Sequence, residues 1–271
     1  MSDTTADTTA LSPTWRIAPT VPVAVGVFIA YVVVFTGLAS SSGIAFDDWF
    51  TSGANLFRAA VIPLIGGSLV LIVFLVWARW DFVFKDPERL PMSGLLRVLL
   101  VLYVLVIVTQ FAIAGWSNVT LDWLLAAVAA GILVGFAEET LFRGIVLRSL
   151  RTHDRPEAWV LVISSVWFGF MHLMNIVNGL SLVGALSQSL FATMSGVMFY
   201  LFRRARGLLV VATVAHGLFD MSRFLPKPAG GLITIDRLLP IVFVVSALIA
   251  VVVIVRHDRS VTVTRSGLKS L

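Results

Sequence analysis

The chain has 271 residues, of which 58% are hydrophobic and 13% charged, and its mean hydropathy is +0.96. Because soluble domains carry about 25% charged residues, this composition excludes a water-soluble globule and a disordered chain. Apolar runs of about 20 residues indicate membrane-spanning helices, so we expect an all-α, polytopic membrane protein in the cell membrane. The absence of cysteine excludes disulfides, thiolate metal sites and a cysteine nucleophile.

Eight apolar segments are predicted as transmembrane helices. They cover roughly 17–38, 59–78, 96–115, 123–150, 158–175, 181–202, 207–222 and 238–255. The polar residues 1–14 are interpreted as a disordered cytoplasmic tail, and residues 15–120 as N-terminal transmembrane helices. Residues 121–222 form a helical core, followed over 223–271 by the last transmembrane helix and a basic cytoplasmic tail.

The basic residues predict the topology. Sixteen of the 20 Lys and Arg residues fall at the N-terminus, at the C-terminus and in the even-numbered connections, and four fall in the odd-numbered ones. Basic loops stay in the cytoplasm, so we expect both termini there. The net charge of +5 is explained by the same rule, and we expect no nucleic-acid partner.

Ionisable residues inside the apolar segments are concentrated in three of them. Charged groups are costly in a bilayer and are functional hypotheses by default, whereas Gln110 and Gln188 are polar only and receive no role. The ionisable residues are Glu138, Glu139 and Arg143 in the fourth segment, His172 in the fifth, and His216 and Asp220 in the seventh.

Helix geometry predicts that residues from the three segments meet. At 1.5 Å per residue, they lie roughly 14–21 Å along their helices from the predicted cytoplasmic ends. We therefore expect Glu138, His172, His216 and Asp220 to share one depth in the membrane.

Local spacing adds two pairs. Glu139 and Arg143, like His216 and Asp220, stand four residues apart and share a helix face. Alone, the Glu139–Arg143 pair is most simply a buried ion pair that fixes packing, and a single intramembrane histidine is more often structural than catalytic. The shared depth favours function over these alternatives.

Glycines accompany these residues. Gly131 and Gly135 form a stripe of small residues that allows another helix to approach closely. Gly169 and Gly217 lie near the two histidines, where we expect them to leave room for a substrate or water.

This set of side chains suits hydrolysis. A glutamate with a histidine partner deprotonates water, and a second histidine donates to a developing oxyanion. The same residue types bind zinc, so a metal-activated water is an alternative, with Glu138, His172, His216 and Asp220 as candidate ligands. The sequence contains neither an HExxH motif nor a GxSxG elbow.

Three motifs carry a family resemblance. EETLFR (138–143) resembles the EExxxR motif of the CPBP family, the CAAX-protease and bacteriocin-processing membrane proteins. FGFMH (168–172) resembles its FxxxH motif, and HGLFD (216–220) is similar to its HxxxN or HxxxD signature. The order and spacing agree as well, and the resemblance covers about 138–220.

The resemblance implies a glutamate-dependent intramembrane endopeptidase of the type II CAAX prenyl endopeptidase kind. It implies that Glu138 and His172 activate water, and that His216 and Asp220 form the oxyanion site. Glu139 and Arg143 would order the site or bind substrate. The resemblance leaves open whether a divalent metal such as zinc takes part. Eukaryotic-type prenyl endopeptidases have Asn at the position of Asp220. An Asn amide donates a hydrogen bond at any pH, whereas an Asp side chain donates one only when it is protonated.

Two other functions remain as alternatives. One is a non-enzymatic membrane scaffold or bacteriocin-immunity-type protein, against which the retained buried charges argue. The other is a proton- or cation-coupled transporter, a class that usually shows internal repeats and broken helices. The expected partners are the bilayer and a membrane-associated peptide or protein substrate.

Overall fold

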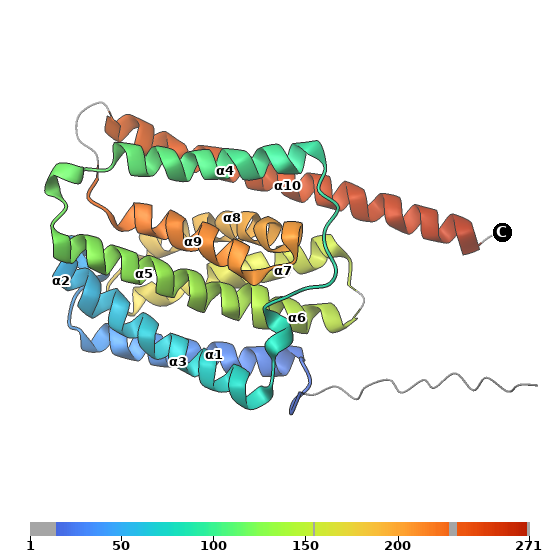
Figure 1. Ribbon diagram of the computed structural model, residues 1–271, viewed down its shortest axis with the longest axis horizontal. Coiled ribbons are helices and arrows are strands. Elements are labelled where there is room, and N and C mark those ends of the chain that lie inside the picture. Colours follow the sequence, from blue (N-terminus) through green and yellow to red (C-terminus); the bar gives the residue numbers. More distant parts are fainter. Residues whose placement is uncertain (1–14, 154, 228–231, 270–271) are drawn as a thin grey trace, which may run out of the picture.

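The computed structural model describes residues 15–153, 155–227 and 232–269. These residues form a bundle of long helices that run side by side between two ends (Figure 1), and the one β-bridge among them, Lys85 with Leu208, is isolated. The predicted tail at 1–14 lies outside the described residues. The long helices are α1 (Val21–Ser41), α3 (Ile62–Ala78), α4 (Gly94–Ile113), α5 (Leu121–Glu139), α7 (Glu157–Met171), α8 (Leu182–Arg206), α9 (Leu209–Phe224) and α10 (Leu232–Lys269).

Seven segments of the described chain are long and apolar enough to cross a membrane. They coincide with seven of the predicted segments, which confirms an all-α polytopic membrane protein. The predicted segment 207–222 corresponds to α9, which has 16 residues and falls below spanning length. In Figure 1, successive long helices alternate in direction. Despite its shorter length, α9 follows this alternation and connects the two ends of the bundle.

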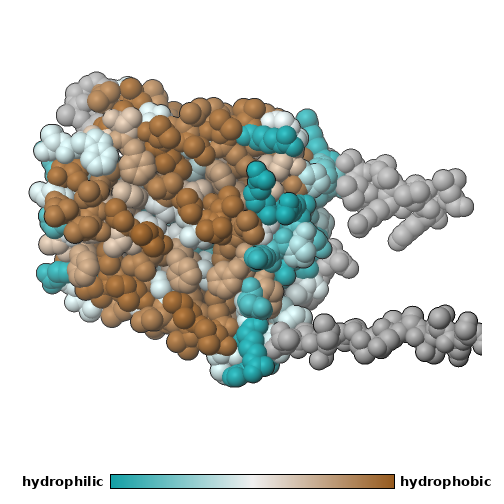
Figure 2. Space-filling view, viewed as in Figure 1, coloured by the Kyte–Doolittle hydropathy of each residue, from teal (hydrophilic) through white to brown (hydrophobic). Residues whose placement is uncertain are grey.

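The outer surface is suited to lipid. One face is covered largely by hydrophobic side chains (Figure 2), and large aliphatic residues protrude from several helices. Val73, Val76 and Ile132, for example, are 67%, 73% and 65% exposed. Such exposure would be costly in water, so the bundle is stable only with this surface in hydrocarbon.

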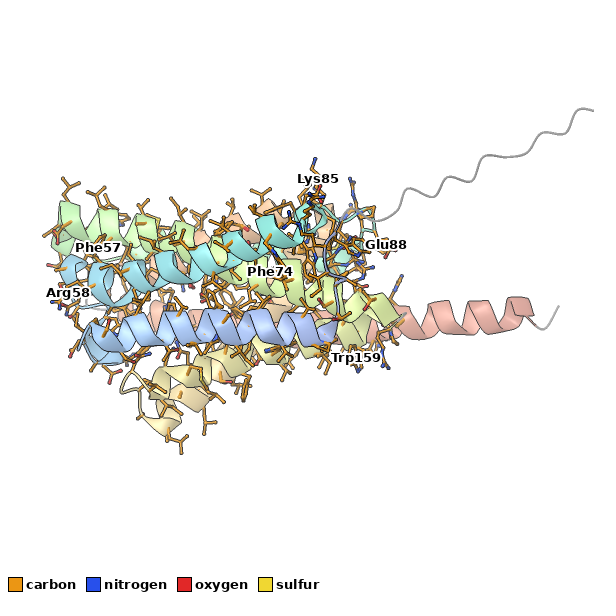
Figure 3. All side chains as sticks on the ribbon, turned by 90° about the horizontal axis from the view of Figure 1, so that it is seen from below. Phe57, Arg58, Phe74, Lys85, Glu88 and Trp159 are labelled. Atoms are coloured by element: carbon orange, nitrogen blue, oxygen red, sulfur yellow. The ribbon has the colours of Figure 1, made fainter. Side chains whose placement is uncertain are left out.

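One end of the bundle is basic. The start of α1 and the end of α10 both lie there, and hydrophilic side chains gather beside them (Figures 1 and 2). Seen from below, Lys85 and Glu88 lie at this end, whereas Phe57 and Arg58 lie at the other (Figure 3). We call the two the basic end and the opposite end.

A buried acid holds the basic end together. Asp86, in the connection before α4, accepts hydrogen bonds from Arg148 at 3.2 Å, Arg151 at 2.7 Å and Arg204 at 2.8 Å. Arg204 also pairs with Glu157 at the start of α7. These bonds tie the connection 79–93 to α6 (Leu147–Leu150), η6 (Arg151–His153) and α8, so the buried charges are paired.

Glycines let α5 and α9 pack almost backbone to backbone. A Cβ placed on Gly131 would lie 2.8 Å from the carbonyl oxygen of Gly217, and one placed on Gly135 would overlap the carbonyl oxygen of Thr213. The predicted close approach at this stripe is confirmed. The expectation that Gly217 leaves room for substrate is wrong, because the backbone of α5 fills that space.

Gly169 behaves in the same way. A Cβ there would overlap Thr193 and lie 2.5 Å from the carbonyl oxygen of Ser189, both on α8. The space near His172 is therefore occupied by helix packing, and the expectation of an open volume at this glycine is also wrong.

The long helix predicted over 123–150 is interrupted. Directly after Glu139, α5 continues as the π-helical segment η5 (Thr140–Val146), and regular α-helix resumes at α6. A second π-helical segment, η2 (Phe57–Val61), follows α2 (Gly53–Leu56). Short π-helical turns are frequent at functional sites, and η5 begins where the two adjacent glutamates end α5.

Candidate active site

Three elements bring the predicted ionisable residues together. Glu138 and Glu139 end α5, and His216 lies at the middle of α9 with Asp220 one turn later. His172 is the first residue of η7 (His172–Ile176), directly after α7. Because α5 and α9 are in backbone contact, the paired glutamates and His216 are held at one level of the bundle.

His216 lies at the centre of the site. Its Nδ1 is 2.8 Å from Oε1 of Glu139, and its Nε2 is 3.8 Å from Oε2 of Glu138 and 3.5 Å from Oδ2 of Asp220. The ring stacks on Phe199 with 4.0 Å between centroids and is 3% exposed. One imidazole therefore contacts all three acids, and its orientation is fixed by stacking and by the Glu139 contact.

Arg143 neutralises the inner acid. Its Nη1 donates to Glu139 Oε1 at 2.9 Å, and its Nη2 donates to the carbonyl of Gly196 on α8 at 2.7 Å. The guanidinium lies over the rings of Phe168 and Phe199, and both charged side chains are essentially fully buried. The predicted i,i+4 pair is confirmed, and it extends through Glu139 to His216.

Glu138 has a different environment. Within the described residues, its Oε2 atom is buried and has no hydrogen-bond partner. Native proteins rarely leave a buried carboxylate oxygen unpaired, so such an atom indicates a bound water or ligand. Oε2 of Glu139 is likewise buried without a partner, but Oε1 of Glu139 is paired with Arg143 and His216, and only Glu138 lines a cavity, so the two glutamates are not equivalent.

His172 is held by its own helix. Its Nδ1 lies 2.9 Å from the backbone carbonyl of Phe168, and its ring packs edge-on against the Phe168 ring. A carbonyl only accepts hydrogen bonds, so Nδ1 is the donor. In the neutral imidazole, Nε2 is then the lone-pair acceptor.

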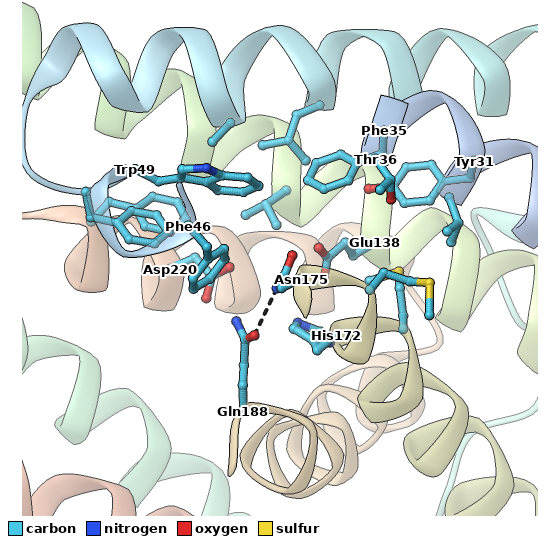
Figure 4. A pocket seen from close by; sticks show the side chains of 18 residues that line it. Tyr31, Phe35, Thr36, Phe46, Trp49, Glu138, His172, Asn175, Gln188 and Asp220 are labelled. Carbon is cyan, nitrogen blue, oxygen red and sulfur yellow. Dashed lines mark hydrogen bonds between the residues drawn. The ribbon is translucent and has the colours of Figure 1, made fainter. Parts of the chain in front are cut away.

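The site opens into two adjoining cavities of about 110 Å³ and 330 Å³. His172, Gln188 and Asp220 line both, Glu138 lines the first, and His216 lines the second. The first cavity is shown in Figure 4, where Glu138, His172 and Asp220 approach one another. A single water needs only about 10–15 Å³, so this space accommodates several waters or part of a peptide.

Sequence reasoning missed part of the lining. Asn175 donates to Gln188 at 2.9 Å across the first cavity (Figure 4), although Gln188 was assigned no role. Asn175 follows His172 by three residues, so a search for polar residues on the histidine's helix face would have found it. Phe46, Trp49 and Tyr31 line the cavity from the N-terminal part of the chain, where no motif marks them.

The described residues do not form an evident metal site. Across 15–153, 155–227 and 232–269, no group of three His, Asp or Glu side chains is arranged to hold a metal ion. Nδ1 of His216 is already engaged by Glu139, which in turn binds Arg143. The donor set thus fits a hydrogen-bonded relay better than a ligand shell.

Comparison with known proteins finds one similarity, and it lies in this core. Residues 120–222 match the sequence model described as "Type II CAAX prenyl endopeptidase Rce1-like". No curated protein and no solved structure matches the chain. The matched region spans α5 to α9 and contains Glu138, His172, His216 and Asp220. The predicted resemblance is thereby confirmed, since residues 120–222 of this membrane protein are similar to the Rce1-like type II CAAX prenyl endopeptidases.

Proposed function

We propose that this protein is a glutamate-dependent intramembrane endopeptidase of the cell membrane that hydrolyses peptide bonds of membrane-associated proteins or peptides. The observation that carries the proposal is the convergence of Glu138, His172, His216 and Asp220 around two adjoining cavities inside the bundle. The family match supports proteolysis as the reaction class.

Glu138 and His172 are proposed to activate the water. The unpaired Oε2 of Glu138 and the acceptor Nε2 of His172 both suit the binding of a water hydrogen. The water oxygen attacks the peptide carbonyl carbon, and its proton passes to the Glu138 carboxylate. This general-base step contributes a rate enhancement of about 10²–10⁴ in enzymes.

His216 and Asp220 are proposed to stabilise the oxyanion. In its imidazolium form, His216 donates a hydrogen bond from Nδ1–H to Glu139. Its Nε2–H then points toward the space between Glu138 and Asp220. A protonated Asp220 offers a second donor. As the tetrahedral intermediate collapses, the proton held by Glu138 passes to the amide nitrogen, and the carbon–nitrogen bond breaks.

Glu139 and Arg143 are proposed as positioning residues. Both are buried, and the contact with His216 is made by Glu139. Arg143 fixes Glu139, and bonds to α8 through Gly196. The pair thereby links the orientation of the imidazole to the packing of three helices, α5, α8 and α9.

The test compares peptides of the host membrane in cells that carry the wild-type protein and in cells that carry Glu138→Gln. The wild type is expected to produce peptide ends that are absent with Glu138→Gln at equal protein abundance. A purified wild-type protein that yields no such ends, from membranes or from a peptide library in lipid nanodiscs, would contradict the proposal.

A further inference from the structure

We propose that Tyr31 of α1 is a positioning residue for the catalytic base, joined through a bound water to the carboxylate of Glu138. The inference rests on the proposed function for the role of Glu138 as a base, whereas the contact itself is argued from geometry. Tyr31 lies outside residues 120–222, the part of the chain that matches the family model. The active site is then completed by a helix outside that core.

The ring of Tyr31 is held inside the bundle by the neighbouring helix α3. A Cβ placed on Gly67 of α3 would lie 2.5 Å from Cε2 of Tyr31, so a larger residue there would collide with the ring. The ring also stacks on Phe35, one turn later in α1, with 6.0 Å between centroids. Tyr31 is therefore only 1% exposed, and it lines the first cavity together with Glu138 (Figure 4).

Aromatic contacts hold this part of α1 at the level of the active site. Phe28, three residues before Tyr31, packs edge-on against Phe142 of η5 and Trp167 of α7, with 6.2 Å and 5.4 Å between ring centroids. Phe142 follows Glu138 by four residues, or about one helical turn. Because residues three apart share a helix face, the face of α1 that carries Tyr31 is the one packed against the site.

The Tyr31 hydroxyl is a buried polar group without a hydrogen-bond partner among the described residues. The same is true of the Thr36 hydroxyl and of Oε2 of Glu138, and all three side chains line the first cavity. Buried polar groups are nearly always paired with protein or with ordered water. A water needs about 10–15 Å³ and two to four polar partners. Three unpaired atoms around a cavity of about 110 Å³ therefore indicate a bound water.

Two other neutral donors of the lining are already engaged. Asn175 donates to Gln188, and the indole N–H of Trp49 donates to the carbonyl of Ile44. The hydroxyls of α1 thus remain to hold a water beside the carboxylate. A hydroxyl donates one hydrogen bond and a water donates two, so the water links a donor on α1 to an acceptor on α5.

This water and the nucleophilic water occupy different sides of Glu138. Figure 4 shows Tyr31 and Thr36 on one side of the carboxylate and His172 on the other. Each carboxylate oxygen accepts two hydrogen bonds. Oε2 of Glu138 accepts one from the water held by α1, which keeps the carboxylate in one orientation, and a second from the nucleophile.

Fluorine NMR tests the contact independently of catalysis. The chain has three tyrosines, Tyr31, Tyr103 and Tyr200, so labelling with 3-fluorotyrosine gives three resonances, each assigned by its Tyr→Phe variant. We expect Glu138→Gln to move the Tyr31 resonance, because an amide oxygen accepts a weaker hydrogen bond than a carboxylate. Asp220→Asn is the matched control, since it neutralises another acid of the same cavity, and it should leave that resonance in place.

Two NMR results would overturn the inference. One is a Tyr31 resonance that Glu138→Gln leaves unmoved. The other is a resonance that Glu138→Gln and Asp220→Asn move equally, which would reveal a general effect of charge in the cavity instead of a specific contact.

Kinetics in nanodiscs test the positioning role. Tyr31→Phe is expected to lower kcat about tenfold, part of the roughly 10²–10⁴ that a general base contributes, with KM and Tm unchanged. Tyr103→Phe is the matched control and should keep the wild-type kcat. Its hydroxyl is also buried without a partner among the described residues, but Tyr103 lines neither cavity.

A Tyr31→Phe variant with the wild-type kcat, or with a loss confined to KM or Tm, would contradict the positioning role. A wild-type protein that cleaves nothing would instead count against the proposed function, and the NMR result would still decide whether Tyr31 contacts Glu138.

Discussion

Nδ1 of His216 lies 2.8 Å from Oε1 of Glu139, and this contact turns the other ring nitrogen toward Glu138 and Asp220. The same Oε1 atom accepts a hydrogen bond from Arg143. One carboxylate oxygen thus connects a buried cation to the central imidazole, so a structural ion pair and the proposed catalytic group cannot be varied separately.

Glu138→Gln is expected to abolish cleavage and to leave the fold intact. The amide keeps the volume of the carboxylate but cannot act as a base, and Oε2 of Glu138 has no hydrogen bond to lose among the described residues. The measurements are the cleavage rate in nanodiscs and the thermal midpoint Tm. A Tm that falls together with activity would mean that Glu138 supports the fold instead.

Glu139→Gln is expected to lose activity and stability together. Removing one partner of a buried ion pair costs about 3–5 kcal/mol, because the other charge stays buried, and Arg143 is 1% exposed. Expression level and Tm are compared with those of Glu138→Gln, the matched neighbour. If Glu139→Gln changes neither Tm nor rate, the ion pair does not position His216.

Asp220 distinguishes a hydrogen-bond role from a metal role. If the neutral acid donates to the oxyanion, Asp220→Asn keeps most activity, because the amide donates a hydrogen bond in nearly the same shape. Asp220→Ala is expected to lose roughly 100-fold, the cost of one oxyanion donor.

The decisive measurements for Asp220 are the cleavage rates of the three forms and the metal content of each. An Asn variant as inactive as the Ala variant, accompanied by loss of a bound metal, would overturn the donor role and support a metal-activated water.

Gly135→Ala is expected to move α9 away from α5. The added Cβ would overlap the carbonyl oxygen of Thr213, and overpacking of this kind costs about 1–3 kcal/mol. The displacement also separates His216 from Glu138, so the cleavage rate should fall beyond the loss of folded protein. Gly37→Ala is the control, since nothing lies within 4 Å of its added Cβ. Equal rates per folded molecule would show that the site tolerates a wider helix spacing.

Asp86→Ala is expected to destabilise the basic end without changing catalysis per folded molecule. It leaves Arg148, Arg151 and Arg204 without their shared acid. Because Arg204 is 2% exposed, we expect the free energy of unfolding to fall by about 3–5 kcal/mol. Glu88→Gln is the matched control, because its side chain is 73% exposed and surface pairs contribute about 1 kcal/mol or less. A changed kcat in folded Asp86→Ala protein would show that the network also reaches the active site.

Apolar segment length and basic-residue placement predicted the helical bundle well. The alternation of basic connections required eight segments, and α9, only 16 residues long, still runs between the two ends as that count demands. The spacing of Glu139 and Arg143 predicted their contact, since i,i+4 neighbours meet on any helix. The depth of each residue along its helix also predicted that His216 lies beside Glu138. That calculation depends only on the rise per residue and on the order of the connections.

The rest depends on contacts that no local pattern encodes. Gly169 and Gly217 were expected to border open space, but whether a glycine faces a cavity or a helix is set by the neighbouring element. Gln188 was set aside because it carries no charge, yet it meets Asn175 inside the cavity. The contribution of Trp49 arises from a connection that folds over the site, and its position follows from tertiary packing alone.

The π-helical segment η5 sets the rotational phase between the two halves of its helix. A π-helical turn holds one residue more than an α-helical turn, so deleting one residue from Thr140–Val146 and returning to ordinary winding would leave the residues beyond it with nearly their present orientation. Arg148 could then still reach Asp86 at the basic end. Among related sequences, a single-residue gap in this stretch should therefore be accompanied by continuous α-helix.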